Sequence, residues 1–271
     1  MSEAMISLRN VSKTFPGSHE PAVGDLSLEI GTGETVVLVG PSGCGKTTTM
    51  KMINRLVEPT SGSILIAGED ARAKDPVGLR RDIGYVIQSI GLLPHRTVRQ
   101  NMTTLPWILG WDESRTNERV EELIEMLDLD PGLLLRYPSE LSGGQRQRVG
   151  VARALAADPP VMLMDEPFGA VDPIVRERLQ DEFLRIQERI HKTIVFVTHD
   201  VDEAIKMADR IAILNVGGVL EQYAAPAEIL GSPANDFVRR FVGLDRGLKG
   251  LALRNASDVE QVIAAVRGSA G

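Results

Sequence analysis

The stretch GPSGCGKT at residues 40–47 decides the fold of this 271-residue chain. It follows the apolar run 35–39 and precedes a helical pattern that starts at Lys46. A glycine-rich loop between a buried strand and a helix suits phosphate groups, because glycines let backbone N–H groups turn inward and the helix N-terminus adds partial positive charge. The pattern predicts a nucleoside triphosphate site, with Lys46 at the β- and γ-phosphates and the Thr47 hydroxyl on Mg²⁺.

The composition is that of a soluble globular protein, with 43% hydrophobic and 25% charged residues. No apolar stretch approaches the ~18 residues that cross a bilayer, and the N-terminus lacks the features of a signal peptide. The net charge of −7 argues against a nucleic-acid groove. The single cysteine, Cys44, excludes an intrachain disulfide framework and a cysteine-based zinc site. We therefore expect a cytoplasmic protein.

Hydrophobic patterns along the chain alternate between strand and helix signals. Helical spacing covers the region 98–135 and the segments 146–156, 175–190 and 201–207. Apolar or alternating runs predict strands over 6–11, 23–30, 35–39, 62–67, 83–87, 161–165, 193–197, 210–214 and 219–223. The alternation predicts an α/β fold with a mostly parallel sheet flanked by helices.

A second pattern narrows the class of nucleotide-binding protein. The sequence LSGGQ at 141–145 stands just before a helical segment, and the later apolar strand 161–165 ends in Asp165 and Glu166. Two carboxylates at the end of a buried strand suit a Mg²⁺-directed aspartate followed by a general base.

These motifs, with His199 downstream, stand in the order found in ATP-binding cassette (ABC) ATPases, and the chain resembles that family over roughly residues 5–242. The resemblance implies a P-loop NTPase with a RecA-like core, an antiparallel β subdomain and an α-helical subdomain inserted at about 97–140. The tail 243–271 shows no pattern that suggests chemistry, and we interpret it as a possible truncated linker to a regulatory module.

The resemblance also assigns roles to single residues. Phe15 would stack on adenine, unless it is a core phenylalanine, and Gln88 would meet Mg²⁺ or water and sense the membrane partner, unless it is an ordinary exposed glutamine. Asp165 would hold Mg²⁺ through water, Glu166 would polarise the attacking water, and His199 would contact the γ-phosphate unless it is a polar loop residue. The residues implied in nucleotide binding are Phe15, Gly40, Pro41, Ser42, Gly43, Cys44, Gly45, Lys46, Thr47, Thr48, Ser142, Gly143, Gly144, Gln145 and Asp172.

Two of these positions carry a further expectation. Asp172 ends the sequence GAVD, in which Gly169 replaces the serine usual in the family. Cys44 either fills space in the loop or is a reactive thiol, and we predict that its alkylation blocks ATP binding and that bound nucleotide protects it.

The resemblance implies a homodimer, because Ser142 and Gly144 of one copy would close over the γ-phosphate held by Lys46 of the other. It further implies an importer ATPase on the cytoplasmic face of the membrane, held by permease subunits and served by an extracytoplasmic substrate-binding protein. Long coiled coils and a tandem cassette are absent from the sequence, which argues against chromosome-maintenance ATPases and translation factors.

The only indication of the transported substrate is the similarity of short sequence segments to those of known importers. Segments 43–56, 84–94 and 245–253 look like those of importers for glycine betaine, carnitine or choline, with amino acids or polyamines as the alternative. Many such ATPases continue into paired cystathionine-β-synthase-type modules, which we do not expect within this chain. The region 83–135, with Leu92, Leu93, Trp107, Ile108 and Trp111, is expected to dock on the permease, although the two tryptophans equally fit a buried helical core.

Overall fold

The computed structural model describes residues 4–87, 91–169, 171 and 173–243. The chain forms two compact units: unit 1 comprises Met1–Lys74 and Thr193–Gly271, and unit 2 comprises Asp75–Lys192. The chain therefore passes from one unit to the other twice, after Lys74 and after Lys192. The predicted helical insertion at 97–140 lies within unit 2, and the predicted tail beyond 243 lies outside the described residues.

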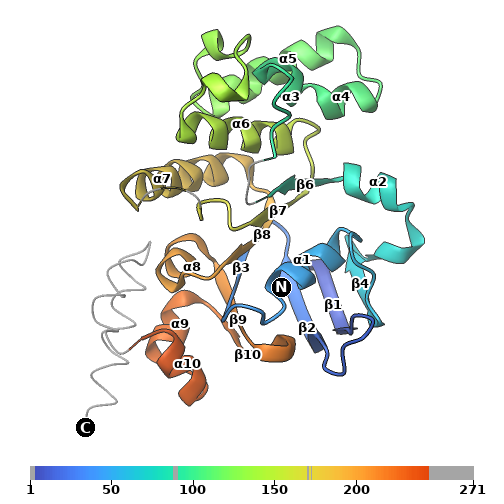
Figure 1. The fold of residues 1–271 in the computed structure, drawn as a ribbon, viewed down its shortest axis with the longest axis vertical. Coiled ribbons are helices and arrows are strands. Elements are labelled where there is room, and N and C mark those ends of the chain that lie inside the picture. Colours follow the sequence, from blue (N-terminus) through green and yellow to red (C-terminus); the bar gives the residue numbers. More distant parts are fainter. Residues whose placement is uncertain (1–3, 88–90, 170, 172, 244–271) are drawn as a thin grey trace. The chain divides into compact units, whose positions relative to one another are not determined.

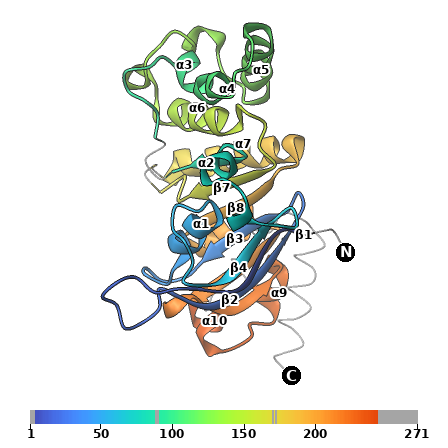
Figure 2. The ribbon, with the colours of Figure 1, turned by 90° about the vertical axis from the view of Figure 1, so that its right-hand side faces the viewer.

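Unit 1 contains an antiparallel sheet (Figure 2). Its strands, in the order β2-β1-β4-β5, are β1 (Ala4–Lys13), β2 (Val23–Gly31), β4 (Ser61–Ile66) and β5 (Glu69–Asp70). In β2, Val23, Leu26, Leu28 and Ile30 are buried and most residues between them are not, as expected of a sheet with one covered face. The antiparallel β subdomain was predicted, whereas the two-residue strand β5 is too short to leave a pattern.

A second sheet in unit 1 carries the parallel strands β3 (Thr35–Val39), β8 (Thr193–Thr198) and β9 (Arg210–Asn215). Strand β10 (Val219–Ala224) pairs antiparallel with β9, so the order is β10-β9-β3-β8. Every residue of β3 and β8 is buried. Continuous burial without alternation is typical of parallel strands covered on both faces, which is why these two strands are apolar runs interrupted only by terminal threonines.

Short helices complete unit 1, and most begin at a side-chain cap. Asp200 accepts hydrogen bonds from the N–H groups of Asp202 and Glu203, and Asn235 accepts one from Val238. The helices α9 and α10 were not predicted, because six residues are too few to show helical periodicity. The helices are α1 (Lys46–Ile53), η1 (Ala71–Ala73), α8 (Val201–Met207), η4 (Val216–Gly218), α9 (Pro226–Gly231) and α10 (Asp236–Phe241).

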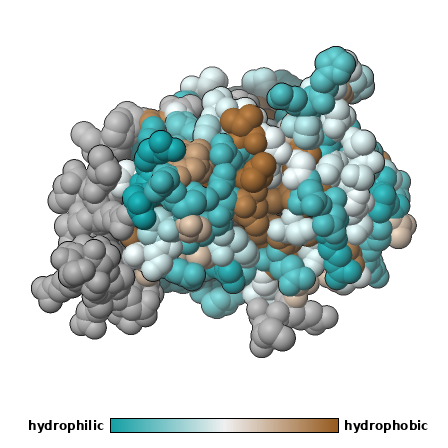
Figure 3. All heavy atoms as spheres, turned by 90° about the horizontal axis from the view of Figure 1, so that it is seen from below, coloured by the Kyte–Doolittle hydropathy of each residue, from teal (hydrophilic) through white to brown (hydrophobic). Residues whose placement is uncertain are grey.

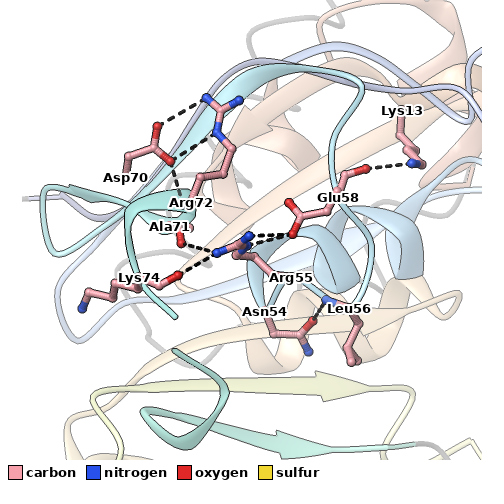
Figure 4. A network of polar contacts seen from close by, with 9 residues as sticks. All are labelled: Lys13, Asn54, Arg55, Leu56, Glu58, Asp70, Ala71, Arg72 and Lys74. Atoms are coloured by element: carbon pink, nitrogen blue, oxygen red, sulfur yellow. Dashed lines mark hydrogen bonds and ion pairs between the residues drawn. The ribbon is translucent and has the colours of Figure 1, made fainter. Parts of the chain in front are cut away.

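Arg55 ties the end of α1 to the segment that leaves unit 1 (Figure 4). Its Nη1 donates to the carbonyl oxygens of Ala71 at 3.1 Å and Lys74 at 2.8 Å, and its Nε donates to Oε1 of Glu58 at 2.9 Å. The side chain is only 13% exposed. One guanidinium thus donates to two backbone carbonyls at the end of η1, that of Ala71, which also accepts from the N–H of Lys74, and that of Lys74 itself.

Unit 2 combines two parallel strands with a helical layer (Figure 1). Strand β6 (Ile83–Val86) pairs with β7 (Val161–Asp165), and α3 and α5 both pack on α6. The predicted helical region 98–135 is divided into separate helices, with a break at Thr103 and a positive φ of 73° at Gly110. The helices are α2 (Pro76–Arg81), α3 (Val98–Met102), α4 (Thr104–Ile108), α5 (Glu113–Met126), η2 (Pro131–Leu133), η3 (Pro138–Glu140), α6 (Gly143–Leu155) and α7 (Pro173–Ile190).

One face of the described residues is drawn in Figure 3. It is mostly hydrophilic or intermediate in hydropathy, with a band of apolar side chains near its middle and smaller apolar patches elsewhere. Of the helices in the described ranges, none combines the length and the hydropathy needed to cross a bilayer.

Candidate active site

The loop at residues 40–47 lies so close to neighbouring backbone that two of its glycines leave no room for a side chain. A Cβ on Gly40 would lie 2.1 Å from the carbonyl oxygen of Leu214, and one on Gly45, where φ is 96°, would lie 2.4 Å from that of Ala22. By contrast, a Cβ on Gly43 would meet nothing within 4 Å, although its φ is 80°. The loop is therefore packed against the strands on one side and open at Gly43, as a phosphate cradle requires.

Lys46 is folded over this loop. Its Nζ donates to the carbonyl oxygens of Gly40 at 2.7 Å and Pro41 at 3.0 Å, and the residue is only 7% exposed. Ser42 and Gly43 are exposed, whereas Thr47 and Thr48 are half-buried at the start of α1. A cation held at the centre of a loop whose rim is accessible fits a phosphate group of ATP.

The structure supports the space-filling interpretation of Cys44. The residue is fully buried, its Sγ lies 3.6 Å from Nζ of Lys46, and a Cβ on Gly40 would approach that sulfur to 2.8 Å. An alkylating reagent reaches such a sulfur only when the loop opens. The predicted protection by nucleotide stays a prediction.

Strand register brings His199 beside the phosphate loop. Val39, the last residue of β3, pairs with Thr198, the last residue of β8, so Gly40 and His199 leave the same edge of the sheet next to each other. His199 is exposed there. The N–H of Asp200 donates to Oγ1 of Thr198 at 3.0 Å, which holds the turn between β8 and α8. The sequence could show each motif but not that these two strands are neighbours.

Phe15 lies on the loop between β1 and β2, and it is 41% exposed. Nζ of Lys13 lies 5.2 Å from the centre of its ring. The alternative of a core phenylalanine on a strand is therefore wrong, and the ring remains an accessible aromatic face for a base.

In unit 2, Asp165 and Glu166 lie at the carboxyl end of β7, the strand that pairs with β6. Met164 pairs with Val86, so Asp165 ends β7 where β6 also ends. Glu166 has a φ of 44°, an uncommon value for a residue other than glycine, and it accepts a hydrogen bond at its carbonyl from the N–H of Gly169 at 3.0 Å. Backbone strain of this kind clusters at functional sites.

Gly169 lies next to the side chain of Glu166. A Cβ at position 169 would lie 3.4 Å from Oε2 of Glu166 and 3.3 Å from its carbonyl oxygen. A side chain at position 169 would therefore make an ordinary contact with this carboxylate and a slightly tight one with the carbonyl oxygen.

Tyr85 is a neighbour of Asp165 that the sequence did not single out. It pairs with Leu163, so it shares a sheet face with Asp165, two residues further along β7. Burial raises the pKa of Tyr85 to about 12, and the negative charge of Asp165 adds to the effect. The Tyr85 hydroxyl therefore stays protonated at neutral pH.

The signature sequence begins α6 with a complete capping box. The N–H of Gln145 donates to Oγ of Ser142 at 3.2 Å, and the N–H of Ser142 donates to Oε1 of Gln145 at 2.9 Å. Ser142 and Gly143 are exposed, whereas Gly144 is buried with Cδ2 of Leu179 3.4 Å from where its Cβ would be. An exposed, capped helix start is able to present backbone N–H groups to an anion.

Two predicted site residues, Gln88 and Asp172, lie outside the described residues. The remaining candidates for Mg²⁺ are the Thr47 hydroxyl, in unit 1, and the Asp165 carboxylate, in unit 2. Both are hard oxygen donors of the kind that Mg²⁺ prefers.

A separate groove of about 280 Å³ lies in unit 2. Beside it, three consecutive apolar side chains of α4 and the following turn are exposed: Trp107 by 75%, Ile108 by 45% and Leu109 by 38%. Trp107 is therefore a surface residue rather than a core residue, while Trp111 is half-buried beneath the guanidinium of Arg115. The groove is lined by Ile83, Gly84, Tyr85, Leu93, Thr104, Leu105, Ile108, Arg153 and Ala154.

Comparison with known proteins gives consistent results. The profile of the ABC transporter family matches residues 23–169. The chain is 55% identical over 258 residues to the choline transport ATP-binding protein OpuBA of Bacillus subtilis, covering 95% of this chain and 66% of that protein. It is 56% identical to the osmoprotectant import ATP-binding protein OsmV of Salmonella typhimurium (94% and 68% covered), and 51% identical to the glycine betaine uptake ATP-binding protein YehX of Escherichia coli (94% and 82% covered).

Solved structures agree. The dimeric post-hydrolysis structure of the ATP-binding cassette MJ0796, bound to ADP and Pi, matches with a TM-score of 0.70 and 35% identity, covering 82% of this chain and 99% of that one. The chain spans about two thirds of the length of the first of these sequence relatives. It belongs to the ABC transporter family and contains the ATP-binding domain of that family.

Proposed function

We propose that this chain is the ATP-hydrolysing subunit of an importer for quaternary-ammonium osmoprotectants such as glycine betaine, carnitine or choline. The observation that carries the proposal is the similarity, over nearly the whole chain, to proteins named for choline, osmoprotectant or glycine betaine transport. The subunit would be held by permease subunits at the cytoplasmic face of the membrane. An extracytoplasmic binding protein would select the substrate.

In this proposal, the loop at 40–47 binds the phosphates of ATP. Lys46 is already close to the loop carbonyls, and its ammonium group neutralises phosphate charge from the centre of the cradle. The N–H groups at the start of α1 and the helix dipole add to this attraction. Phe15 offers its exposed ring to adenine.

Hydrolysis needs a metal ion, a general base and a contact to the γ-phosphate. When bound, Mg²⁺ supplies charge neutralisation of the phosphates, and Thr47, Gln88 and Asp165 would hold it. Glu166 would accept a proton from the attacking water, and His199, next to the phosphate loop in the sheet, would donate a hydrogen bond to the γ-phosphate.

Two copies would form two shared sites. Ser142, Gly143, Gly144 and Gln145 of one copy would close on the nucleotide bound to the other copy, with Asp172 at the same interface. This arrangement is supported by the dimeric cassette structures that match this chain. Because both copies contribute to stabilising the transition state, hydrolysis becomes dependent on dimer closure.

The groove in unit 2 is proposed as the place where the permease docks. It is mainly apolar, and the exposed Trp107, Ile108 and Leu109 extend its apolar surface. Exposed aromatic and aliphatic groups beside a concave site are typical of interaction surfaces.

Co-purification tests the proposed function. The subunit would be isolated with its permease and binding protein, and the ligand retained by the binding protein would be identified by mass spectrometry. ATP turnover in the assembled complex should rise when glycine betaine, carnitine or choline is supplied with the binding protein. A binding protein that holds an amino acid or a polyamine instead would overturn the substrate assignment, and a complex without ATPase activity would overturn the enzyme assignment.

A further inference from the structure

Lys13 lies against the exposed ring that is proposed to receive the base of ATP. It is the last residue of β1, and its Nζ lies over the ring of Phe15, 5.2 Å from the ring centre. An ammonium group within about 6 Å of a ring centre is attracted by the negative face of the aromatic system. The contact therefore holds the ring of Phe15 with one face towards the cation.

The ring of Phe15 is more accessible than the other rings that contact a cation in the described part of the chain. In both of those contacts the ring is half-buried: Trp111 lies with Arg115, and Tyr223 lies with Arg210. Phe15 is 41% exposed although an ammonium lies over one of its faces. This exposure leaves the other face for a planar group from outside the protein.

The ammonium group of Lys13 is itself held in place (Figure 4). Its Nζ donates to the carbonyl oxygen of Glu58 at 2.7 Å, and the carboxylate of Glu58 accepts from Nε of Arg55 at 2.9 Å. The side chain of Arg55 is only 13% exposed and also donates to two backbone carbonyls. Because a nearly buried guanidinium holds Glu58, the carbonyl that accepts from Lys13 has little freedom to move.

The backbone around Lys13 is tied to the same segment. The N–H of Thr14 donates to Oγ1 of Thr60 at 3.0 Å, and the N–H of Thr60 donates to the carbonyl oxygen of Ser12 at 2.8 Å. The residues on both sides of Lys13 are therefore bonded to the segment 58–60, which also accepts from its side chain. One segment thus holds both the backbone and the ammonium group beside Phe15.

An ammonium behind the ring changes what the free face offers to a base. Face-to-face contact of two aromatic systems is weakened by the negative charge on both faces. A cation on the far side draws the π electrons of Phe15 towards itself and reduces this repulsion. A ring that is already held also loses little conformational freedom when a base stacks on it. Both effects favour stacking of the purine of ATP, and neither depends on its phosphates.

We propose that Lys13 is a positioning residue for the nucleobase: held by the carbonyl of Glu58, its ammonium fixes and polarises Phe15 so that the base of ATP stacks on the opposite face of the ring. The inference rests on the proposed function, because it assumes that Phe15 receives the base. Lys13 then contributes to the part of the affinity that comes from the base, whereas Lys46 contributes to the part that comes from the phosphates.

A comparison of two ligands tests the proposal. Titration calorimetry of the purified subunit would measure its affinity for MgATP and for magnesium tripolyphosphate, which carries the phosphates without a base. Lys13→Met keeps an unbranched side chain and removes the charge. It should weaken ATP binding about threefold to fivefold, the effect of one cation–π contact at an exposed site, and leave tripolyphosphate binding within about 1.5-fold of the wild type. Unchanged tripolyphosphate binding also shows that the phosphate loop of the variant is folded.

Two further variants control for the charge itself. Lys13→Arg keeps a cation beside the ring and should bind ATP within about twofold of the wild type. Lys74→Met removes a positive charge from the same unit, from a lysine whose Nζ lies 3.3 Å from Oε2 of Glu69 and that contacts no ring in the described ranges. It should bind both ligands as the wild type does.

A double-mutant cycle separates positioning of Phe15 from a direct contact between Lys13 and the base. Phe15→Leu should weaken ATP binding, and Lys13→Met should cause no further loss in that background. An equal loss with and without Phe15, a loss shared by ATP and tripolyphosphate, or wild-type ATP affinity in Lys13→Met would overturn the inference. Wild-type ATP affinity in Phe15→Leu would instead remove the proposed assignment of Phe15 to the base, and the inference with it.

Discussion

Nζ of Lys46 lies 2.7 Å from the carbonyl oxygen of Gly40, the first residue of the phosphate loop. The loop therefore closes on its own lysine, and this side chain supports the loop as well as carrying its charge. Loss of the lysine should then affect both nucleotide affinity and the stability of the loop, and the two effects are separable by experiment.

Lys46→Ala should abolish ATP hydrolysis and weaken nucleotide binding at least ~10-fold, because a charge-assisted contact to the phosphates is lost. Binding is measured by titration calorimetry and turnover by phosphate release from the isolated subunit. Lys51→Ala, on the same helix but outside the loop, is the control and should retain both. Unchanged turnover in Lys46→Ala would remove the phosphate-loop assignment.

Glu166→Gln should retain ATP binding and slow hydrolysis by at least ~10²-fold, since the amide does not accept the proton of the attacking water. The variant should accumulate ATP-bound dimers, which gel filtration with and without ATP detects. Calorimetry should give about one nucleotide per chain, as two shared sites in a dimer require. A variant that stays monomeric with ATP would contradict the shared-site arrangement.

Gly45→Ala and Gly43→Ala separate packing from backbone strain. Both glycines have a positive φ, but only a Cβ at position 45 meets backbone, 2.4 Å from the carbonyl oxygen of Ala22. Gly43→Ala should lower the free energy of unfolding by about 1 kcal/mol, the usual cost of this conformation for an alanine. Gly45→Ala should cost clearly more, as measured by urea unfolding. Equal losses would show that the loop is less tightly packed than described.

Arg55→Met should lower the free energy of unfolding by about 2–3 kcal/mol, because the carbonyls of Ala71 and Lys74 lose a charged donor in a part-buried place. Arg72→Met is the control: Arg72 also pairs with a carboxylate, that of Asp70, but its side chain is 52% exposed. Its loss should cost less than ~1 kcal/mol. Similar values for the two variants would argue against the anchoring role of Arg55.

Asp158 should make stability depend on acid pH. Burial alone would raise the pKa of Asp158, but hydrogen bonds and charges of Lys192 and Arg119 outweigh it and hold the pKa below its usual value. A lowered folded-state pKa gives stability that is present above the unfolded value of ~3.9 and is lost as the pH falls through the folded value.

Asp158→Asn should therefore be less stable than the wild type at pH 7, and the difference should shrink below about pH 4. The effect should stay under ~1 kcal/mol and decrease with salt, since the side chain is 60% exposed. Urea unfolding of both proteins at several pH values provides the measurement. A difference that does not change with pH would mean that Asp158 acts through packing rather than through its charge.

The long strands and helices were predictable because each shows a clear pattern over several residues, either continuous apolar character or helical spacing. β3 and β8 are buried throughout and are apolar except for Thr35, Thr193 and Thr198, and α5 and α7 show helical spacing over several turns. The six-residue helices α9 and α10 were missed because so few residues do not display a period. Their sequences offered only helix-start signals, a proline at the first helical position (Pro226) and an N-cap asparagine (Asn235).

The residues of the site could be identified from the sequence, but their arrangement in space could not. Residue types at Lys46, Asp165, Glu166 and His199 indicated their chemistry. That β3 pairs with β8, so that His199 lies beside Gly40, is a long-range choice that no local pattern specifies.

The capping box of α6 has a consequence for the rate at which two copies join. Ser142 and Gln145 satisfy each other within one chain, so the start of this helix is already ordered before any partner or nucleotide arrives. A surface that is ordered in advance loses little conformational entropy when it binds. Dimer formation should then be limited by diffusion and by the charge of the two approaching faces rather than by local folding, and its association rate should change with ionic strength more than with temperature-induced fraying of α6.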